Sequence, residues 1–431
     1  MRRKHWVVMV LGALLLVASP LLAACGGEEP AVAPQPAAPA VPVEKKVKVG
    51  LGLSVTGALA STTKPISYGL WDYLKYVNDV QGGLKYTSPA GVQETVTLDI
   101  KWEDMAYDPA RAVDTYRRLE AWGAQVMHLT AGSMVLTVLD SITRDQVPVV
   151  YYGPIQPNSA AARPVYSIGE FPGYSDEDAV FLDWVKANWT ESRPPRVGFL
   201  NLETAMARVE LPGQVPAYAE SIGVEHVGQE WVPYALTDAS VELKRLADKD
   251  PDFIFFAHVP SGASVILKDA VRMGIRDKIK FGQIFWGFTE ATIATAGEAS
   301  EGLYGMVPAA LTTEDLPGVN LARETMLTYR PGDLFNSVYL QGFTLGRFMV
   351  EGIKKALETV GYENLTRDAI NEALFTTTNL DMGGVVPPIT IDREFGILAN
   401  NYRVAVVKDG KFVIVSDWMP SNNLLKGWVP D

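Results

Sequence analysis

Cysteine is nearly absent from this chain. Among 431 residues it occurs once, at Cys25, which excludes an internal disulfide and any paired-cysteine metal or redox site. Histidine is also scarce, and His5, His128, His226 and His258 are not spaced as metal ligands, which disfavours a histidine-based zinc site. The sequence therefore predicts no metal and no other cofactor.

Positive charge is in short supply as well. The chain has 38 Lys and Arg against 50 Asp and Glu, a formal net charge of −12, and no basic run follows the first four residues. A nucleic-acid binder normally carries a basic patch, so nucleic acid is disfavoured as a partner. With 48% hydrophobic and 20% charged residues, the composition is that of a globular protein. At about 100–200 residues per domain, two or three domains are expected.

The N-terminus has the organisation of an export signal. Arg2, Arg3 and Lys4 precede an apolar run of roughly 17 residues, which is short for a membrane-spanning helix. The run ends in Leu-Ala-Ala-Cys at 22–25, which resembles the bacterial lipoprotein signal. This resemblance implies that residues 1–24 are removed and that Cys25 carries the lipid. The alternative is an uncleaved anchor helix.

A tether is expected after the cysteine. Residues 26–44 contain five prolines and five alanines and cannot form a core. We therefore predict an extended segment at 25–45, a folded body from about residue 46, and a short tail at 419–431.

The body alternates apolar strands with helices of 10–17 residues, which predicts right-handed βαβ units and parallel sheets. The first block has expected strands at 47–53, 95–103, 124–129 and 147–152 and helices at 63–80, 108–122 and 134–144. The pattern restarts after Val165, with helices at 176–189, 211–222, 239–247 and 262–273 and strands at 196–200, 225–232, 253–257 and 280–283. Helices at 320–329, 337–359 and 367–375 and a hairpin around Asp409-Gly410 are expected to follow. Two similar α/β lobes are predicted.

A glycine motif and an acidic pair in the first part of the body give only weak evidence for a cofactor site or a catalytic site. Gly50-Leu51-Gly52 begins a dinucleotide-binding pattern, but Val55 stands where its third glycine belongs. Glu103-Asp104 follows a strand, where paired carboxylates could serve acid–base or metal chemistry. The simpler interpretation is that they form a turn and cap the next helix.

Other candidate residues follow the carboxyl ends of strands, where α/β sheets bind ligands. Gly132 and Ser133 combine free N–H groups at a helix start with a hydroxyl, which suits a carboxylate, although Ser133 could also be an ordinary cap. Ser54 and Thr56 lie in a polar turn after the first strand. His258, Trp286 and Tyr174 could contact a ligand or could serve capping and packing.

Taken together, these segments resemble the branched-chain amino-acid-type solute-binding proteins of ABC transporters. Ser-Val-Thr-Gly at 54–57 resembles the opening S-x-T/S-G loop of the family. The segment EDMAYDPARAV at 103–113 is similar to D-D-x-x-x-D-P-x-x-A-V. Val-Pro-Val-Val at 147–150 with Gly153, and Lys-Asp-Gly-Lys-Phe at 408–412, also match, so the similarity covers roughly residues 46–418.

The resemblance implies a type I periplasmic-binding fold, in which two Rossmann-like lobes with parallel central sheets are joined by a three-crossing hinge. Lobe 1 would comprise 46–167 plus 307–391, and lobe 2 would comprise 168–306 plus 392–418. The protein would be exported, monomeric and held at the membrane only by its lipid. It would capture a small molecule by hinge closure and deliver it to permease subunits, without catalysis.

The resemblance also implies the ligand contacts. The ligand's carboxylate would bind at Gly132 and Ser133 and at the backbone of 153–155, which includes Gly153 and Ile155. Thr56 and Thr62 would line the pocket.

Three positions depart from the family pattern. The usual Tyr-Gly after the first strand of lobe 2 is replaced near Ala205, and the Asp after the first crossing falls near Tyr174. The acidic partner of an amino acid's ammonium group is replaced near Gly262. A buried ammonium without a carboxylate is costly, so a less charged or aromatic organic acid or amide is expected, with Tyr174 and Trp286 as aromatic walls.

Two other classes of function stay open at this point. The same clamp could be a sensor subunit coupled to a signalling receptor. An exported hydrolase using Glu103 or Asp104 with His258 is the third class, although no nucleophile–base pair is recognisable in the sequence.

Overall fold

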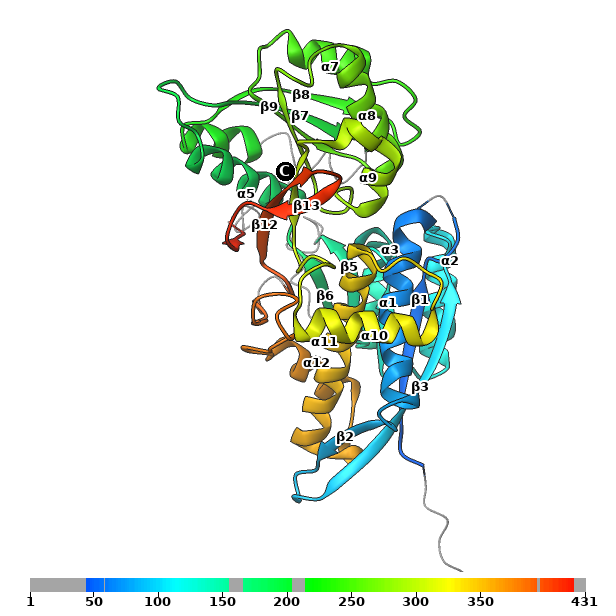
Figure 1. The fold of residues 1–431 in the computed structure, drawn as a ribbon. Coiled ribbons are helices and arrows are strands. Elements are labelled where there is room, and N and C mark those ends of the chain that lie inside the picture. The colour runs from blue at the N-terminus through cyan, green and yellow to red at the C-terminus, as the bar shows by residue number, and fades with distance from the viewer. Residues whose placement is uncertain (1–43, 58, 155–165, 204–213, 394–395, 422–431) are drawn as a thin grey trace, which may run out of the picture. The chain divides into compact units, whose positions relative to one another are not determined.

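The computed structural model describes residues 44–57, 59–154, 166–203, 214–393 and 396–421 (Figure 1). The predicted signal peptide, Cys25 and nearly all of the predicted tether lie outside these residues, as do Ile155 and Ala205. No helix within the described ranges is both long enough and apolar enough to cross a membrane.

The first lobe is built on a six-stranded sheet. Its strand order is β2-β3-β1-β4-β5-β6, and every neighbouring pair is parallel except β2 with β3. The strands are β1 (Lys46–Leu53), β2 (Leu84–Thr87), β3 (Gln93–Asp104), β4 (Val126–Leu129), β5 (Val149–Pro154) and β6 (Ser167–Phe171).

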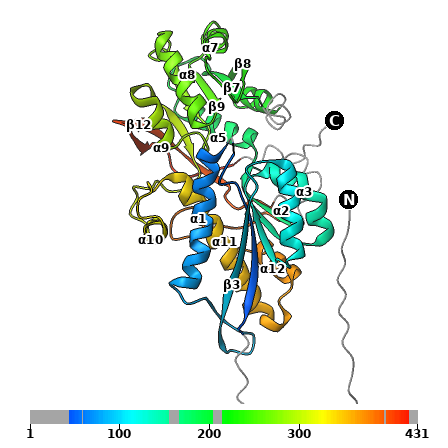
Figure 2. The same cartoon turned by 90° about the vertical axis from the view of Figure 1, so that its right-hand side faces the viewer.

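Helices cover both faces of this sheet, so the central strands β1 and β4 are buried along most of their length, whereas β2 and β3 at the edge keep polar, partly exposed residues. Figure 2 shows α1 (Ala60–Asp79) and α11 (Ser337–Val360) on one side and α2 (Pro109–Ala121) and α3 (Gly132–Asp145) on the other. Two further helices, α10 (Pro317–Tyr329) and α12 (Arg367–Phe375), complete the lobe.

The second lobe has an eight-stranded sheet with β14 at one side. The order is β13-β12-β11-β10-β9-β7-β8, and the run from β8 to β11 is parallel. Its strands are β7 (Arg196–Leu202), β8 (Glu225–Val232), β9 (Phe253–Ala257), β10 (Lys280–Gln283), β11 (Tyr304–Val307), β12 (Asn401–Lys408), β13 (Lys411–Ile414) and β14 (Met419–Pro420). Its helices include α5 (Tyr174–Ala187), α7 (Ser240–Ala247), α8 (Pro260–Arg272) and α9 (Glu290–Ala296).

Strand β9 shows why this sheet needs two helical layers. Phe253 and Phe255 pack in one apolar cluster with side chains of α5, whereas Ile254 and Phe256 pack in another with side chains of α7 and α8. Alternate residues of a strand point to opposite faces, so both faces of β9 are buried.

The chain passes between the two sheets three times within the described residues. The first passage lies between β6 and α5, the second follows β11, and the third precedes β12. Because β6 pairs with β5, residues 168–171 belong to the first sheet, four residues beyond the lobe boundary drawn from the sequence. Leu398 and Ala399 bond to the carbonyl oxygens of β6, so the third passage also lies later than position 392.

The C-terminal hairpin predicted around Asp409-Gly410 is confirmed by the antiparallel pairing of β12 with β13. Asp409 and Gly410 have φ values of 51° and 67°, the left-handed conformation that two-residue hairpin turns require. Strands β2 and β6 were not expected from the sequence, because each is short and depends on a partner strand for its pairing.

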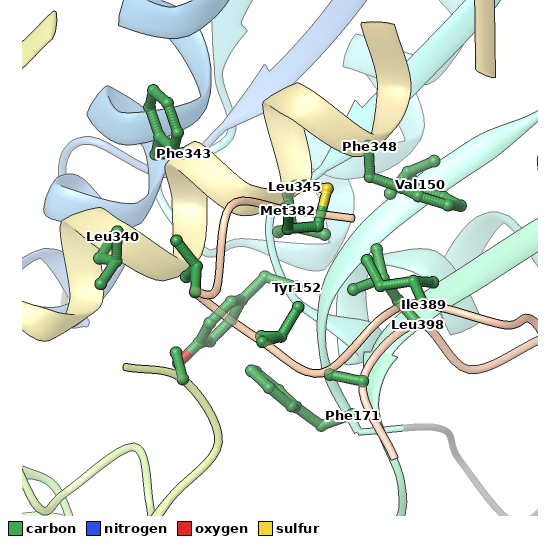
Figure 3. Packing of buried hydrophobic residues seen from close by; sticks show 14 of the residues in the cluster. Val150, Tyr152, Phe171, Leu340, Phe343, Leu345, Phe348, Met382, Ile389 and Leu398 are labelled. Carbon is green, nitrogen blue, oxygen red and sulfur yellow. The ribbon is translucent and has the colours of Figure 1, made fainter. Parts of the chain in front are cut away.

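An apolar core lies between β5 and α11. Figure 3 shows Val150, Leu345 and Phe348 packed with side chains from the long C-terminal loops, including Met382, Ile389 and Leu398. Tyr152 is the polar member of this group, and its hydroxyl donates to Gln341 Oε1 at 3.0 Å. This core packs against β5 near the carboxyl end of the strand, which reaches the candidate site.

Candidate ligand-binding site

A cavity of about 660 Å³ lies where the carboxyl ends of both sets of parallel strands meet. Its volume falls in the range of about 300–1,000 Å³ that small-molecule sites occupy. Residues of both lobes line it, namely Leu59, Thr62, Thr63, Tyr107, Pro109, Ala131, Gly132, Ser133, Met134, Leu136, Thr137, Tyr152, Gly153, Tyr174, Leu202, Tyr234, Val259, Phe285 and Trp286. None of these described lining residues carries a charged side chain.

The start of α3 forms part of the first-lobe wall. Ala131 is its N-cap and has φ 88°, a conformation that costs a non-glycine residue free energy. Within the described residues no side chain caps α3, and its first turn holds no acid. Ser133 Oγ donates to Tyr107 Oη at 3.1 Å. Burial raises the pKa of Tyr107, which therefore stays neutral.

Helix α1 adds two threonines whose hydroxyls differ in their bonding. Thr63 Oγ1 donates to the carbonyl oxygen of Ser54 at 2.6 Å. Thr62 Oγ1 is buried and has no hydrogen-bond partner among the described residues, although Thr62 lines the cavity. An orphaned buried hydroxyl is costly, so this atom is a candidate for bonding a ligand.

The second-lobe wall is largely aromatic. The rings of Tyr174 and Trp286 have centroids 6.3 Å apart, and Phe285 packs against Phe171 at 4.4 Å. Trp286 Nε1 is buried and unpartnered within the described part of the chain. Tyr234 stands after β8 and stacks on His258 with centroids 6.3 Å apart.

Six of the residues proposed from the sequence line this cavity: Thr62, Gly132, Ser133, Gly153, Tyr174 and Trp286. Ser54, Thr56, His258 and Gly262 do not. Ser54 Oγ accepts from the Tyr107 N–H at 3.2 Å, and Thr56 is bonded through its hydroxyl and its N–H to the Asp104 carboxylate. These two residues therefore hold the loop that follows β1.

The acidic pair Glu103-Asp104, which ends β3, makes hydrogen bonds within the protein. Asp104 Oδ1 accepts from the N–H groups of Val55 and Ala106, each at 3.0 Å. Glu103 Oε2 accepts from Arg118 Nε at 2.6 Å. Neither carboxylate lines the cavity, which agrees with the simpler of the two interpretations drawn from the sequence.

The His258 ring packs directly against Gly262. The ring nitrogens of His258 lie 3.1 Å and 3.3 Å from the carbonyl oxygens of Pro233 and Val259, and burial lowers its pKa. A Cβ atom at Gly262 would lie 2.0 Å from His258 Cε1. The histidine ring therefore occupies the space that a side chain at 262 would need.

Sequence reasoning missed several lining residues, including Tyr107, Tyr234 and Phe285. Tyr234 follows a strand that was expected at 225–232, so the rule that ligands bind at carboxyl ends could have found it. Tyr107 lies inside the EDMAYDP segment, but only the packing of α3 beside it brings its hydroxyl to Ser133.

In the described ranges, no group of three or more His, Cys, Asp or Glu side chains is placed so that it could hold a metal ion.

Several proteins of known structure share this fold. A valine-bound branched-chain amino acid ABC transporter protein from Thermus thermophilus has 20% identity and a TM-score of 0.75, over 89% of this chain and 98% of that one. A fatty acid ABC transporter substrate-binding protein from Thermomonospora curvata has 22% identity and a TM-score of 0.73, over 89% and 94%. A leucine binding protein from Thermotoga maritima has 16% identity and a TM-score of 0.67, over 86% and 98%.

At these identities the solved structures establish the shared two-lobed α/β fold. No curated protein matches the chain significantly. The family profile described as periplasmic binding protein matches residues 46–411, which is most of the chain and includes both lobes. The chain therefore belongs to the periplasmic binding protein family.

Proposed function

We propose that this protein is the extracytoplasmic solute-binding component of an ABC importer. The observation that carries the proposal is the cavity, because it is formed at the carboxyl ends of the strands of both lobes, between which the chain passes three times in the described residues. The family match supports it, and so do the ABC transporter proteins among the solved structures of the same fold.

The ligand is a small organic molecule, either an amino acid, an amide or an aromatic or other organic carboxylate. Its polar end binds at Gly132, Ser133 and Thr62, where N–H and hydroxyl groups converge, and its body lies against Tyr174 and Trp286. Movement of the lobes about the three passages closes the site. Closure is driven by the higher affinity of the ligand for the closed state.

The protein performs no reaction on its ligand. The hydrolase alternative needs Glu103 or Asp104 together with His258, and all three are bonded to other protein groups away from the cavity lining. Capture and delivery to permease subunits are therefore its whole task. We also propose that Cys25 carries a lipid that tethers a monomer to the outer face of a membrane.

Ligand-induced stabilisation tests the binding function. The full-length chain would be unfolded thermally with amino acids, amides and carboxylates. At 100 times its dissociation constant, a ligand raises the free energy of unfolding by about 2.7 kcal/mol. Leu136→Trp places an indole in the cavity and should abolish this effect. The matched control Leu327→Trp, at a position 56% exposed on α10, should retain it.

Two outcomes would count against the importer. If no compound of any class stabilises the protein, the binding function is wrong. If a ligand binds but cells carrying the protein do not take it up, the receptor-coupled sensor replaces the importer.

A further inference from the structure

Three helices of the described structure begin at the cavity, and their N-termini carry no acidic side chain that would neutralise the partial positive charge there. Leu59 and Thr62 come from the start of α1, Gly132 and Ser133 from α3, and Val259 from α8. In the described structure none of the three has a side-chain cap, and none has an acidic residue in its first turn. A helix N-terminus presents unpaired N–H groups and about half a positive charge. These N-termini therefore bring partial positive charge to the cavity, whose described lining has no basic side chain.

Within the described residues, two other helices begin at the cavity, and both carry acids of their own that do not line it. The Asp108 side chain caps α2 by accepting from the Arg111 N–H at 2.9 Å. Asp176 and Glu177 lie in the first turn of α5, and Glu177 Oε1 accepts from the Phe285 N–H at 2.7 Å. These carboxyl groups are used within the protein and leave no negative charge among the described lining residues.

The orphaned side-chain atoms at the cavity point to the same chemistry. Thr62 is only 8% exposed, and its hydroxyl finds no partner among the described residues. Trp286 Nε1, also unpartnered in the described part, can only donate a hydrogen bond. Both atoms are satisfied by a ligand oxygen. An ammonium group can donate to the Thr62 hydroxyl, but it would leave Trp286 Nε1 unpaired and would itself lack a counter-charge.

From these contacts we infer that the ligand is a monocarboxylic acid with an apolar or aromatic body and without an ammonium group. This inference rests on the proposed binding function and narrows its ligand class. The carboxylate binds at the α3 N-terminus and the Thr62 hydroxyl. The body lies along the apolar wall of Leu202, Val259, Phe285 and Trp286. α-Amino acids are disfavoured because no described lining residue carries a carboxylate that would balance the charge of their ammonium group.

Matched pairs of compounds isolate the ammonium group. Calorimetric titration of the full-length chain at pH 7.5 would compare 4-methylpentanoate with leucine and 3-phenylpropanoate with phenylalanine. In at least one pair we expect the acid to bind more than tenfold tighter than the amino acid. The corresponding amide should also bind more than tenfold weaker than that acid, since hydrogen bonds to a charged group are the stronger ones.

The outcomes separate the ligand class from the binding function. Amino acids that bind as tightly as the acids, with the effect lost in Leu136→Trp, overturn the ligand class and leave the binding function standing. If an amide binds as tightly as its acid, the inference that the site recognises a carboxylate is wrong. If none of these acids binds, the inferred class is wrong, and the wider panel described above then decides whether the binding function survives.

Two substitutions test the assigned contacts. Thr62→Val removes the orphaned hydroxyl and should weaken binding of the acid about tenfold. Thr325→Val is the matched control, because this buried threonine lies on α10, bonds the carbonyl of its own helix and does not line the cavity. Equal affinities in the two variants would show that Thr62 does not contact the ligand.

Val259→Asp tests the charge argument. Val259 is the N-cap of α8, a position where Asp and Asn are both favourable. The aspartate should weaken binding of the acid and strengthen binding of leucine, each by about tenfold, whereas Val259→Asn should change their ratio little. If aspartate leaves the ratio of the two affinities unchanged, the absence of an acid does not determine specificity.

Discussion

The two lobes place the same part of an α/β sheet at the cavity but present different chemistry there. The first lobe contributes the N-termini of α1 and α3 with the hydroxyls of Thr62 and Ser133, whereas the second contributes the N-terminus of α8 and the aromatic side chains of Phe285 and Trp286. Topology explains why both walls lie at carboxyl ends. It does not explain the difference, which comes from the residues in the loops. One wall is therefore suited to bind a polar end, and the other is suited to bind an apolar body.

A substitution behind the second-lobe wall should have the largest effect on stability. Gly262→Ala would place a methyl group 2.0 Å from His258 Cε1, so the ring must move and disturb Tyr234 and Val259 beside it. We expect the free energy of unfolding to fall by about 2 kcal/mol, measured by urea denaturation. Ser261→Ala, at the exposed neighbouring position, should change it by less than about 0.5 kcal/mol. An equal effect of the two substitutions would contradict the packing role of His258.

The stability of the protein should depend on pH through Glu177, whose carboxyl group accepts from the N–H of Phe285 in the second-lobe wall. Burial raises the pKa of Glu177 well above its usual value, the charge of Asp178 adds to this, and the Phe285 N–H opposes it. The folded protein therefore holds the proton to higher pH than the unfolded chain, whose glutamates titrate near pH 4.3. The resulting stability is complete below that pH and is lost as pH rises toward the folded-state pKa.

Glu177→Gln removes this titration while keeping an oxygen that can accept from Phe285. Its free energy of unfolding should exceed that of the unaltered protein by about 1 kcal/mol or more at pH 8 and differ little at pH 4. The decline with pH should be reduced rather than abolished, because burial also raises the pKa of Glu170 and Asp178. Denaturation curves from pH 4 to pH 8 would show this. The exposed control Glu298→Gln should leave the profile unchanged, and an unchanged profile in Glu177→Gln would refute the assignment.

The smallest expected effect concerns the first-lobe wall. Ala131 has φ 88°, which glycine adopts without strain, so Ala131→Gly should raise the free energy of unfolding by up to about 1 kcal/mol. Ala121→Gly, at the exposed last residue of α2, should lower it by up to about 0.5 kcal/mol. Opposite signs in thermal unfolding would verify that Ala131 is strained, whereas a loss of stability in both would contradict it.

Local signals in the sequence explain which elements could be predicted. The helix beginning at Asp108-Pro109 was expected because Asp caps and Pro begins helices, and Asp108 does accept from the Arg111 N–H. The Asp409-Gly410 turn was expected for a similarly local reason. β6 was not expected, because its place depends on pairing with β5 and on the bonds it receives from Leu398 and Ala399.

The candidate site divides in the same way. Gly132, Ser133 and Trp286 were identified because they follow strands, which is a rule of chain order. Gly262 was noticed as a position without an acidic side chain, but the reason is the His258 ring packed against it. His258 was a candidate ligand contact; its ring nitrogens lie beside the backbone carbonyl oxygens of Pro233 and Val259, and it is not among the described lining residues.

The α/β alternation, the two similar blocks and the scarcity of metal-binding side chains could all be predicted from the chain, because they depend on composition and on the spacing of neighbouring residues. Only the tertiary structure decided that Thr62 and Trp286 lack protein partners and that three helix N-termini without caps or acids meet at one cavity, as the described residues show. Burial and hydrogen-bond satisfaction are properties of groups distant in the chain, and no local pattern contains them.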